Sequence, residues 1–255
     1  MTIIQTIILS IIEGLTEFLP VSSTGHMILA SSIMKIQDDA FVKTFEIAIQ
    51  LGAIMAIVML YAKRFFQGFS IYFKLGTAFL PTAIIGFLAY PFIKAYLFNP
   101  IIVAVSLIVG GIVLILIDKR VVNRQSKTDV LEGLTYKNAF FIGLIQCISM
   151  IPGVSRAAAT IIGGIFNGFD KKQATEFSFL LAVPTMFAAA GYDLLKTPII
   201  FSKHEIILLV IGLVIAFITV WFAVKIFLKI VENYGFKHFG YYRIIIGIIF
   251  LLLIV

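Results

Sequence analysis

The residues that could do chemistry are concentrated in one stretch, Glu13 to Met27, which reads EGLTEFLPVSSTGHM. Ser23 is a candidate nucleophile, and His26, three residues later, is a candidate general base or acid for it. Glu13 and Glu17 are four residues apart, so a helix places both carboxylates on one face, where like charges repel. Such a pair could hold a divalent cation, Mg²⁺ or Ca²⁺, that bridges phosphate groups, or it could orient the histidine.

A second polar stretch, PGVSR, occupies residues 152–156 of an otherwise apolar region. Arg156 is a permanent cation that needs a partner inside a membrane, and its planar fork suits phosphate oxygens. Pro20 and Pro152 break the helices that contain them, and hydroxyl residues such as Ser155 are good N-caps for the next helix. Two helix N-termini that meet would point backbone N–H groups at an anion. The two stretches together favour phosphate chemistry.

Further residues are predicted to bind the substrate: Ser22, Thr24, Gly25 and Ser155 at the breaks, Gln146 before the second break, and Gln50 in the segment 43–62. Each candidate also has a structural alternative. The hydroxyls can be helix caps, the histidine can be a satisfied core residue, and the arginine can be a partner for Glu17. The glutamines can line a cavity or form hydrogen bonds between helices. The carboxylate pair can also belong to a proton or ion pathway.

The composition indicates what class of protein must position these residues. Of the 255 residues, 61% are hydrophobic and 13% are charged, and the mean hydropathy is +1.09, whereas a soluble domain has about 25% charged residues. We therefore expect an all-α polytopic membrane protein with a single integral domain, 1–255. One cysteine excludes an internal disulfide. The net charge of +7 is interpreted as loop residues that set the topology, and no nucleic-acid partner is expected.

Six apolar segments are long enough to span a bilayer, which needs about 20 residues. They are predicted at 43–62, 76–93, 100–118, 173–194, 205–228 and 240–255. Two further segments, 2–34 and 138–168, are each interrupted by proline, glycine, serine and charged residues. Both are predicted to be re-entrant helical hairpins, because a broken backbone is tolerable in a membrane only next to protein or a water-filled cavity.

The order of these segments predicts an inverted repeat. A hairpin followed by three spans occurs twice, in halves of about 1–118 and 136–255, and the odd number of spans makes the second half start from the opposite side. The hairpin tips also match, because Ser23 and Ser155 each follow a proline by three residues. We therefore expect the two tips to meet near the middle of the bilayer.

The basic residues predict the orientation. In this topology five lysines fall on the side of the N-terminus, and fourteen lysines and arginines, Arg243 among them, fall on the other side, which leaves only Arg156. Because positive residues stay in the cytoplasm, both termini are expected outside. The first hairpin then enters from outside and the second enters from the cytoplasm.

Two motifs resemble a known family. EGLTEFLPVSSTGHM (13–27) and PGVSRAAAT (152–160) resemble the signature motifs of the bacterial undecaprenyl-pyrophosphate phosphatases, also called bacitracin-resistance proteins. FEIAIQLGAI, FSFLLAVPTM and YYRIIIGI resemble further family segments, so the likeness extends over nearly the whole chain. The second motif departs from the family, which usually has serine where this chain has Ala157 and often has glycine where it has Ala158.

The resemblance implies an enzyme of the bacterial inner membrane that removes the terminal phosphate of undecaprenyl pyrophosphate at the outer face. The product, undecaprenyl phosphate, would be recycled for peptidoglycan synthesis, and the activity would confer bacitracin resistance. The family's acidic, serine, histidine and arginine positions correspond to Glu13, Glu17, Ser23, His26 and Arg156. A divalent cation is the implied cofactor. The expected partners are the lipid substrate and membrane lipids. Whether the protein forms a homodimer is left open.

The alternative function is that of a secondary transporter or lipid flippase that uses the same midplane site. Inverted repeats and broken helices are typical of transporters, and an intramembrane carboxylate pair suits proton coupling. A serine nucleophile would separate the two functions, because phosphoryl transfer through Ser23 needs its hydroxyl and a proton-coupled carrier does not.

Overall fold

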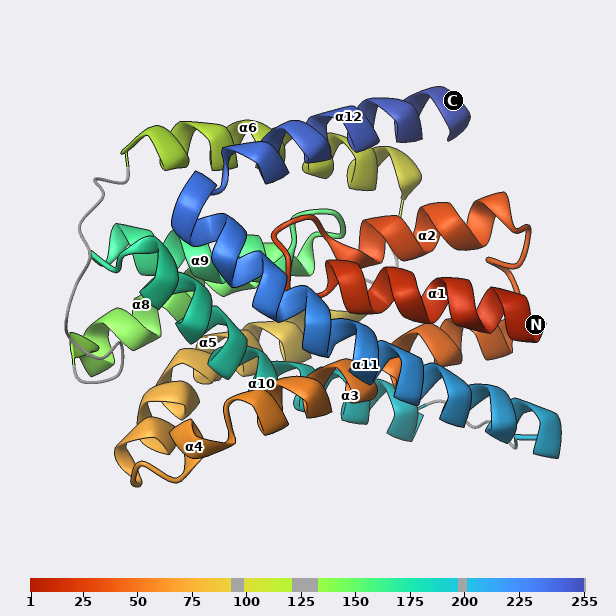
Figure 1. Ribbon diagram of the computed structural model, residues 1–255, viewed down its shortest axis with the longest axis horizontal. Helices are drawn as coiled ribbons and strands as arrows, with labels where there is room; N and C mark the ends of the chain where they lie inside the picture. The colour runs from red at the N-terminus through yellow and green to blue at the C-terminus, as the bar shows by residue number, and fades with distance from the viewer. Residues whose placement is uncertain (93–98, 121–132, 197–200, 255) are drawn as a thin grey trace.

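The computed structural model describes residues 1–92, 99–120, 133–196 and 201–254. In these residues the regular structure comprises eleven α-helices and one 3-10 helix (Figure 1), which confirms the all-α prediction. The first half contains α1 (Ile3–Thr16), α2 (Ser23–Ile33), α3 (Ala40–Leu60), α4 (Ala62–Phe65), α5 (Ser70–Phe92) and α6 (Pro100–Arg120). The second half contains α8 (Tyr136–Gln146), the 3-10 helix η2 (Cys147–Met150), α9 (Arg156–Phe166), α10 (Lys171–Lys196), α11 (Lys203–Tyr234) and α12 (Lys237–Ile254).

Five helices in the described residues are long and apolar enough to cross a membrane: Ala40–Leu60, Ser70–Ala89, Pro100–Lys119, Lys171–Lys196 and Lys203–Tyr234. They correspond to five of the six predicted spans, and the chain is a multi-pass membrane protein. The sixth predicted span, 240–255, forms α12, which is not among the five. Lys94, Arg124 and Lys127, which entered the prediction of orientation, lie outside the described residues.

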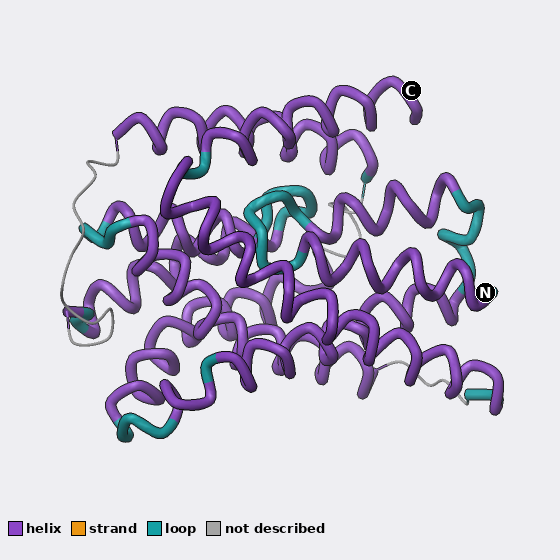
Figure 2. The backbone as a smooth tube through the Cα atoms, in the orientation of Figure 1, coloured by secondary structure: helices purple, strands orange, loops and turns teal. Residues whose placement is uncertain are grey.

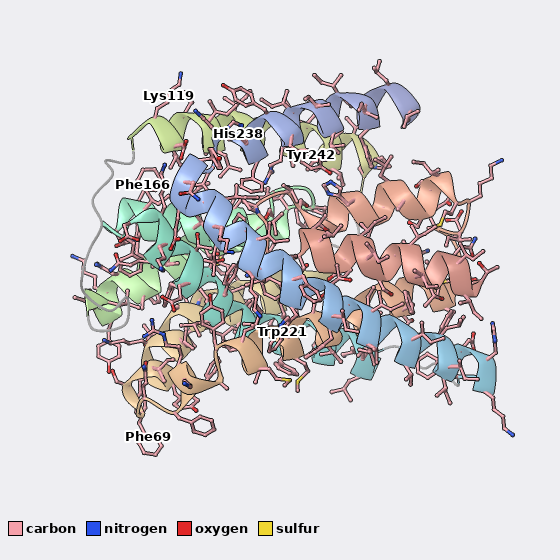
Figure 3. The ribbon with its side chains drawn as sticks, in the orientation of Figure 1. Phe69, Lys119, Phe166, Trp221, His238 and Tyr242 are labelled. Carbon is pink, nitrogen blue, oxygen red and sulfur yellow. The ribbon has the colours of Figure 1, made fainter. Side chains whose placement is uncertain are left out.

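Large apolar side chains are exposed along the outside of the long helices. On α11, Val214, Ile218 and Phe222 are exposed, and Trp221, labelled in Figure 3, lies beside the last two. A soluble monomer rarely exposes so much contiguous apolar surface. Lipid tails are as apolar as these side chains, so the same surface suits a membrane.

The two interrupted segments each form short helices with a turn between them. α1 and α2 flank the turn at 17–22, and η2 and α9 flank the turn at 151–155. Figure 2 shows these two loops side by side near the middle of the molecule. α2 and α9 have 11 residues each, and both begin directly after a serine N-cap. The preceding helices α1 and α8 both begin after a threonine N-cap.

Ion pairs tie the ends of several helices together on one side of the molecule. Lys171 Nζ lies 3.0 Å from Asp118 Oδ1, which joins the start of α10 to the end of α6. Lys172 Nζ lies 2.7 Å from Glu232 Oε1 near the end of α11. The N- and C-termini both lie at the opposite end (Figure 1). Lys119, labelled in Figure 3, also lies at the end that carries these ion pairs. We call this end, with Lys119, Lys171 and Lys172, the basic end, and the other end carries both termini.

α6 and α12 lie side by side as a separate layer over the two turns (Figure 1). Glycine allows their close approach, because a Cβ on Gly111 would come within 2.6 Å of the carbonyl oxygen of Gly240. The reverse contact, from Gly240 to the carbonyl oxygen of Gly111, would be 2.7 Å. Close backbone approach through small residues is the usual way in which membrane helices associate.

Candidate active site

The first turn ends α1 and begins α2. Pro20 has no backbone N–H and cannot continue the helix, and Ser22 then adopts a φ of 70°, in the left-handed region that non-glycine residues rarely use. Ser22 is the N-cap of α2, and its Oγ accepts a hydrogen bond from the N–H of Gly25 at 3.4 Å. This geometry makes Ser23 the first residue of α2.

The second turn has the same backbone geometry. Gly153 has a φ of 93°, and a Cβ there would collide with the carbonyl oxygen of Val103 on α6, so the position requires glycine. Ser155 has a φ of 76° and is the N-cap of α9. Its Oγ accepts a hydrogen bond from the N–H of Ala158 at 3.2 Å.

This geometry corrects the match between the two turns that the proline spacing predicted. Ser155 is equivalent to Ser22, because both are N-caps with a positive φ, and it is not equivalent to Ser23. The first helical residue is Ser23 in one turn and Arg156 in the other. The two turns therefore present different side chains from equivalent positions.

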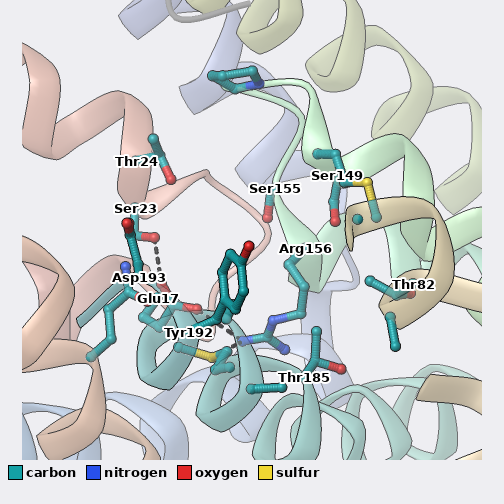
Figure 4. Close-up of a pocket in the computed structure, with 18 of the residues that line it drawn as sticks. Glu17, Ser23, Thr24, Thr82, Ser149, Ser155, Arg156, Thr185, Tyr192 and Asp193 are labelled. Atoms are coloured by element: carbon teal, nitrogen blue, oxygen red, sulfur yellow. Dashed lines mark hydrogen bonds and ion pairs between the residues drawn. The ribbon is translucent and has the colours of Figure 1, made fainter. Parts of the chain in front are cut away.

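Glu17 joins the two turns (Figure 4). Its Oε2 accepts a hydrogen bond from Ser23 Oγ at 2.5 Å, and its Oε1 accepts one from Arg156 Nη2 at 3.0 Å. The guanidinium also donates to the carbonyl oxygen of Ser178 at 3.1 Å and lies 5.2 Å from the centre of the Phe18 ring. All three polar side chains are largely buried, and a buried ion pair is tolerable only with such additional partners. A serine that donates to a carboxylate can serve as an activated nucleophile.

These side chains line the polar end of a cavity of about 490 Å³. The remaining wall comes largely from α5 and α10 and includes Phe79, Gly86, Phe87, Met186, Ala188 and Ala189. Phe87 is 67% exposed, so the cavity reaches the outer surface of the protein at this wall. Asp193 of α10 is a further charged residue of the lining. A cavity that combines charged groups with an apolar wall suits a ligand that has a charged head and an apolar tail.

The structure brings most of the predicted site residues to this cavity: Glu17, Ser22, Ser23, Thr24, Gln50, Ser155 and Arg156. Glu13, Gly25, His26 and Gln146 are not among the residues that line it. Gly25 instead faces α6, where a Cβ would lie 3.4 Å from side-chain atoms of Val103 and Leu107. It is therefore a packing residue of α2 rather than part of the cavity wall.

Gln146 lies behind the wall of the cavity. It is fully buried, and its Nε2 donates to Thr82 Oγ1 at 2.7 Å and to Thr185 Oγ1 at 3.3 Å. Both threonines line the cavity. Gln146 thus forms hydrogen bonds between helices, which was the structural alternative for it, and orients two cavity hydroxyls without lining the cavity itself.

His26 lies away from the hydroxyl that it was predicted to serve. Its Nδ1 is 2.8 Å from the carbonyl oxygen of Ser22, and its Nε2 is 2.8 Å from the hydroxyl of Tyr242, with the two rings nearly parallel. Both ring nitrogens are therefore engaged. Because the hydroxyl of Ser23 points at Glu17, the carboxylate and not the imidazole is placed to take its proton.

Glu13 lies behind Glu17 and is only 1% exposed, and its Oε1 has no hydrogen-bond partner. Among the residues described, no group of three or more histidine, cysteine and acidic side chains is gathered to hold a metal ion. Mg²⁺ is commonly held by one or two carboxylates together with substrate phosphates. The unpartnered oxygen of Glu13 leaves Glu13 and Glu17 as the residues that could hold such a cation.

Arg243 is a residue whose predicted place was wrong. It was counted among the basic residues at the membrane surface, but it is fully buried and donates to carbonyl oxygens of both turns. The sequence did carry a signal, because Arg243 lies inside the predicted span 240–255 and not beside it. Thr82, Ser149 and Thr185 also line the cavity, and no motif marked them.

The sequence of the whole chain matches proteins that are already known. Residues 6–249 match the family model described as bacitracin resistance protein BacA. The chain belongs to this bacitracin resistance protein family. A protein of Bdellovibrio bacteriovorus named undecaprenyl-diphosphatase is 50% identical over 254 residues, which cover 100% of this chain and 97% of that protein. Proteins with the same name from Wolinella succinogenes and Aquifex aeolicus are 51% and 49% identical, and each match covers 98% of both chains.

The cavity lies where the two stretches that resemble motifs of this family meet. The first motif supplies Glu17 and Ser23, and the second supplies Ser155 and Arg156. Ala157 and Ala158, which depart from the usual family pattern, are buried in the first turn of α9. Neither is among the residues that line the cavity, so the missing hydroxyl leaves the cavity wall of this family member unchanged.

Proposed function

We propose that this chain is an undecaprenyl-diphosphatase, the activity named for its relatives. The observation that carries the proposal is the hydrogen-bonded series Ser23–Glu17–Arg156 at the polar end of a cavity with an apolar wall. It supplies a nucleophile, a base and a phosphate-binding cation within one site. A lipid diphosphate matches both the polar and the apolar part of the cavity.

In the first step, Ser23 Oγ attacks the terminal phosphorus of the diphosphate. A bond forms between Oγ and phosphorus while the bond from phosphorus to the bridging oxygen breaks, and Glu17 accepts the serine proton. Undecaprenyl phosphate leaves with the bridging oxygen and the bonding electrons. Arg156 stabilises the charge on the phosphate oxygens, and the N-termini of α2 and α9 add backbone N–H groups.

In the second step, water attacks the phosphoserine and inorganic phosphate is released. The bond between Oγ and phosphorus breaks, and Glu17 returns its proton to Oγ. The phosphate retains one proton of the attacking water, and the other proton is released to the solvent. Each cycle consumes one water molecule, and the enzyme returns to its initial state. Direct attack by water on the diphosphate is the competing route, and it does not require the Ser23 hydroxyl.

We also propose a divalent cation, Mg²⁺ or Ca²⁺, held by Glu13 and Glu17 together with the substrate. When bound, it would neutralise charge on the diphosphate. A chelator should abolish phosphate release, and Mg²⁺ should restore it. Glu13→Gln should raise the cation concentration needed for half-maximal rate by about tenfold, whereas Glu205→Gln, at the exposed start of α11, should not. An unchanged requirement in Glu13→Gln would exclude Glu13 as a ligand.

For the membrane arrangement we propose an inverted repeat of two re-entrant hairpins and six spans, with α12 as the sixth span. The paired N-caps of α1 and α8, and of α2 and α9, support this repeat. The lysines at the basic end support a cytoplasmic location for that end, with the termini outside and the site toward the outer face. A membrane-impermeant thiol reagent should label a cysteine at Asp38 in intact cells but not one at Gln67.

The decisive experiment is phosphate release from undecaprenyl pyrophosphate by the purified protein in detergent, with and without Mg²⁺. Release that disappears in both Ser23→Ala and Arg156→Ala supports the serine mechanism. Release that persists in Ser23→Ala but not in Arg156→Ala assigns the attack to water. If the parent protein releases no phosphate with any cation, the enzyme proposal fails, and lipid or ion transport in liposomes becomes the function to test.

A further inference from the structure

We propose that Arg243 is a positioning residue that holds the two turns in register, an inference that rests on the proposed phosphatase function. Its guanidinium makes five hydrogen bonds, as many as it has N–H groups. The acceptors are main-chain carbonyl oxygens: Leu107 at 3.3 Å from Nε, Pro20 at 3.0 Å and Val154 at 2.9 Å from Nη1, and Ser106 at 3.1 Å and Gly153 at 2.8 Å from Nη2. One side chain from α12 thus binds the first turn, the second turn and α6.

The burial of this cation is unusual. Arg243 is 0% exposed, and none of the ion pairs found among the described residues includes it. A buried charge destabilises a protein unless polar partners replace its water shell. Here carbonyl dipoles alone replace it. An apolar residue would fill the same space at lower cost, so the guanidinium indicates a requirement beyond packing.

The requirement follows from where these carbonyls lie in the chain. Pro20 precedes Ser23 by three residues, and Val154 precedes Arg156 by two. Nη1 donates to both carbonyl oxygens, so one nitrogen atom sets the separation of the two turns. Arg243 is not among the residues that line the cavity. It therefore acts through the turns and not on the substrate itself.

Gly110 on α6 provides the space through which the guanidinium reaches the turns. A Cβ on Gly110 would collide with Nη2 of Arg243. Alanine at this position therefore displaces the guanidinium without removing its charge. Gly247 on α12 offers a matched control, because its Cβ would crowd Ile108 at 2.7 Å and the carbonyl oxygen of Ala104 at 2.9 Å, in the same helix pair. The two alanine variants separate the loss of helix packing from the displacement of Arg243.

The first test is Arg243→Lys, which keeps the charge but offers three donors from one nitrogen atom in place of a planar fork. We expect kcat to fall by about 100-fold, with KM changed by less than about threefold, because misplacement of reacting groups by about 1 Å has an effect of this size. A folded Arg243→Lys protein with a kcat within twofold of the parent's would overturn the proposal. Folding is checked by the thermal unfolding midpoint in detergent.

The second test stands even if Arg243→Lys does not fold. Gly110→Ala should lower kcat about tenfold more than Gly247→Ala, compared at similar losses of thermal stability. Equal losses of kcat would show that only the packing of α6 on α12 matters, and would overturn the proposal. Gly247→Ala is outside the catalytic machinery and reports the packing effect alone.

The third test measures coupling to the nucleophile. If Arg243 acts by positioning Ser23, then Arg243→Lys should reduce the residual rate of a Ser23→Ala protein by less than about threefold, because effects within one catalytic unit are not additive. A full 100-fold loss in that background would indicate an independent, structural effect. Failure of this proposal is distinguishable from failure of the proposed function, because the latter would appear as absence of phosphate release from the parent protein.

Discussion

The two turns share a backbone conformation and differ in charge. Each places a serine with positive φ before an 11-residue helix, and each serine side chain caps that helix. The first turn then presents Ser23 beside the carboxylate of Glu17, and the second presents Arg156. In the proposed mechanism the first turn thus supplies the nucleophile and the base, and the second turn supplies the phosphate-binding cation. The charged pair forms where the two turns face each other.

The helices that lead into the two turns also differ in charge. Glu13 precedes the first residue of α2 by ten positions, and Gln146 precedes the first residue of α9 by the same number. Both side chains are buried, and each has an Oε1 atom without a hydrogen-bond partner, but Nε2 of Gln146 also donates to Thr82 and Thr185. At this pair of equivalent positions the carboxylate therefore belongs to α1, which leads into the first turn, and this is where a cation is proposed.

The largest expected effect comes from removing the serine that only the first turn has at the start of its helix. Ser23→Ala should lower kcat by at least about 1,000-fold, because it removes the nucleophile. Ser155→Ala, in the second turn, should lower kcat by about tenfold at most, since it loses only a cap and a hydroxyl on the cavity wall. The measurement is initial phosphate release at saturating substrate. Similar losses in the two variants would mean that the two serines do not have the distinct roles proposed.

A smaller effect is expected when the arginine of the second turn is replaced by lysine, which keeps the positive charge but lacks the planar guanidinium. Arg156→Lys should lower kcat/KM by about 100-fold, because an ammonium cannot bind Glu17 and a phosphate through a planar fork. Arg64→Lys is the matched control, because Arg64 pairs with Glu176 away from the cavity, and it should change kcat/KM by less than twofold. A parent-like rate in Arg156→Lys would show that the second turn contributes only a positive charge and that the planar guanidinium is not needed.

The smallest effect concerns the shared conformation of the two turns. At position 22 and at position 155, alanine should destabilise the protein by about 1 kcal/mol more than glycine. Both substitutions remove the capping hydroxyl, but only alanine keeps the left-handed strain. Thermal unfolding in detergent measures both pairs. Equal differences at the two positions would support the equivalence of the turns. A difference at one position only would show that the other turn tolerates its conformation through tertiary contacts.

The sequence predicted those residues of the candidate site that belong to the two polar stretches. The spacing of Glu17 and Ser23 around a proline break, and the isolated Arg156, led to side chains that line one cavity. It also predicted Glu17 as a partner of Arg156, which the structure confirms, but it did not predict the other partners that depend on packing between distant helices. His26 meets Tyr242 from α12, and Arg243 reaches both turns from the same helix. Periodicity also could not show that Ser22, and not Ser23, would adopt the capping conformation, since three hydroxyl residues stand in a row.

The exposed apolar edge of the cavity, at Phe87 on α5, has a consequence for kinetics. A lipid that enters sideways from the bilayer never has to dissolve in water. The reaction rate is then set by the number of substrate molecules per unit area of membrane. The apparent KM should then depend on the mole fraction of substrate among lipid or detergent molecules rather than on its molar concentration. Dilution of the substrate with inert detergent at constant total volume should slow the reaction, although the amount of substrate in the tube is unchanged.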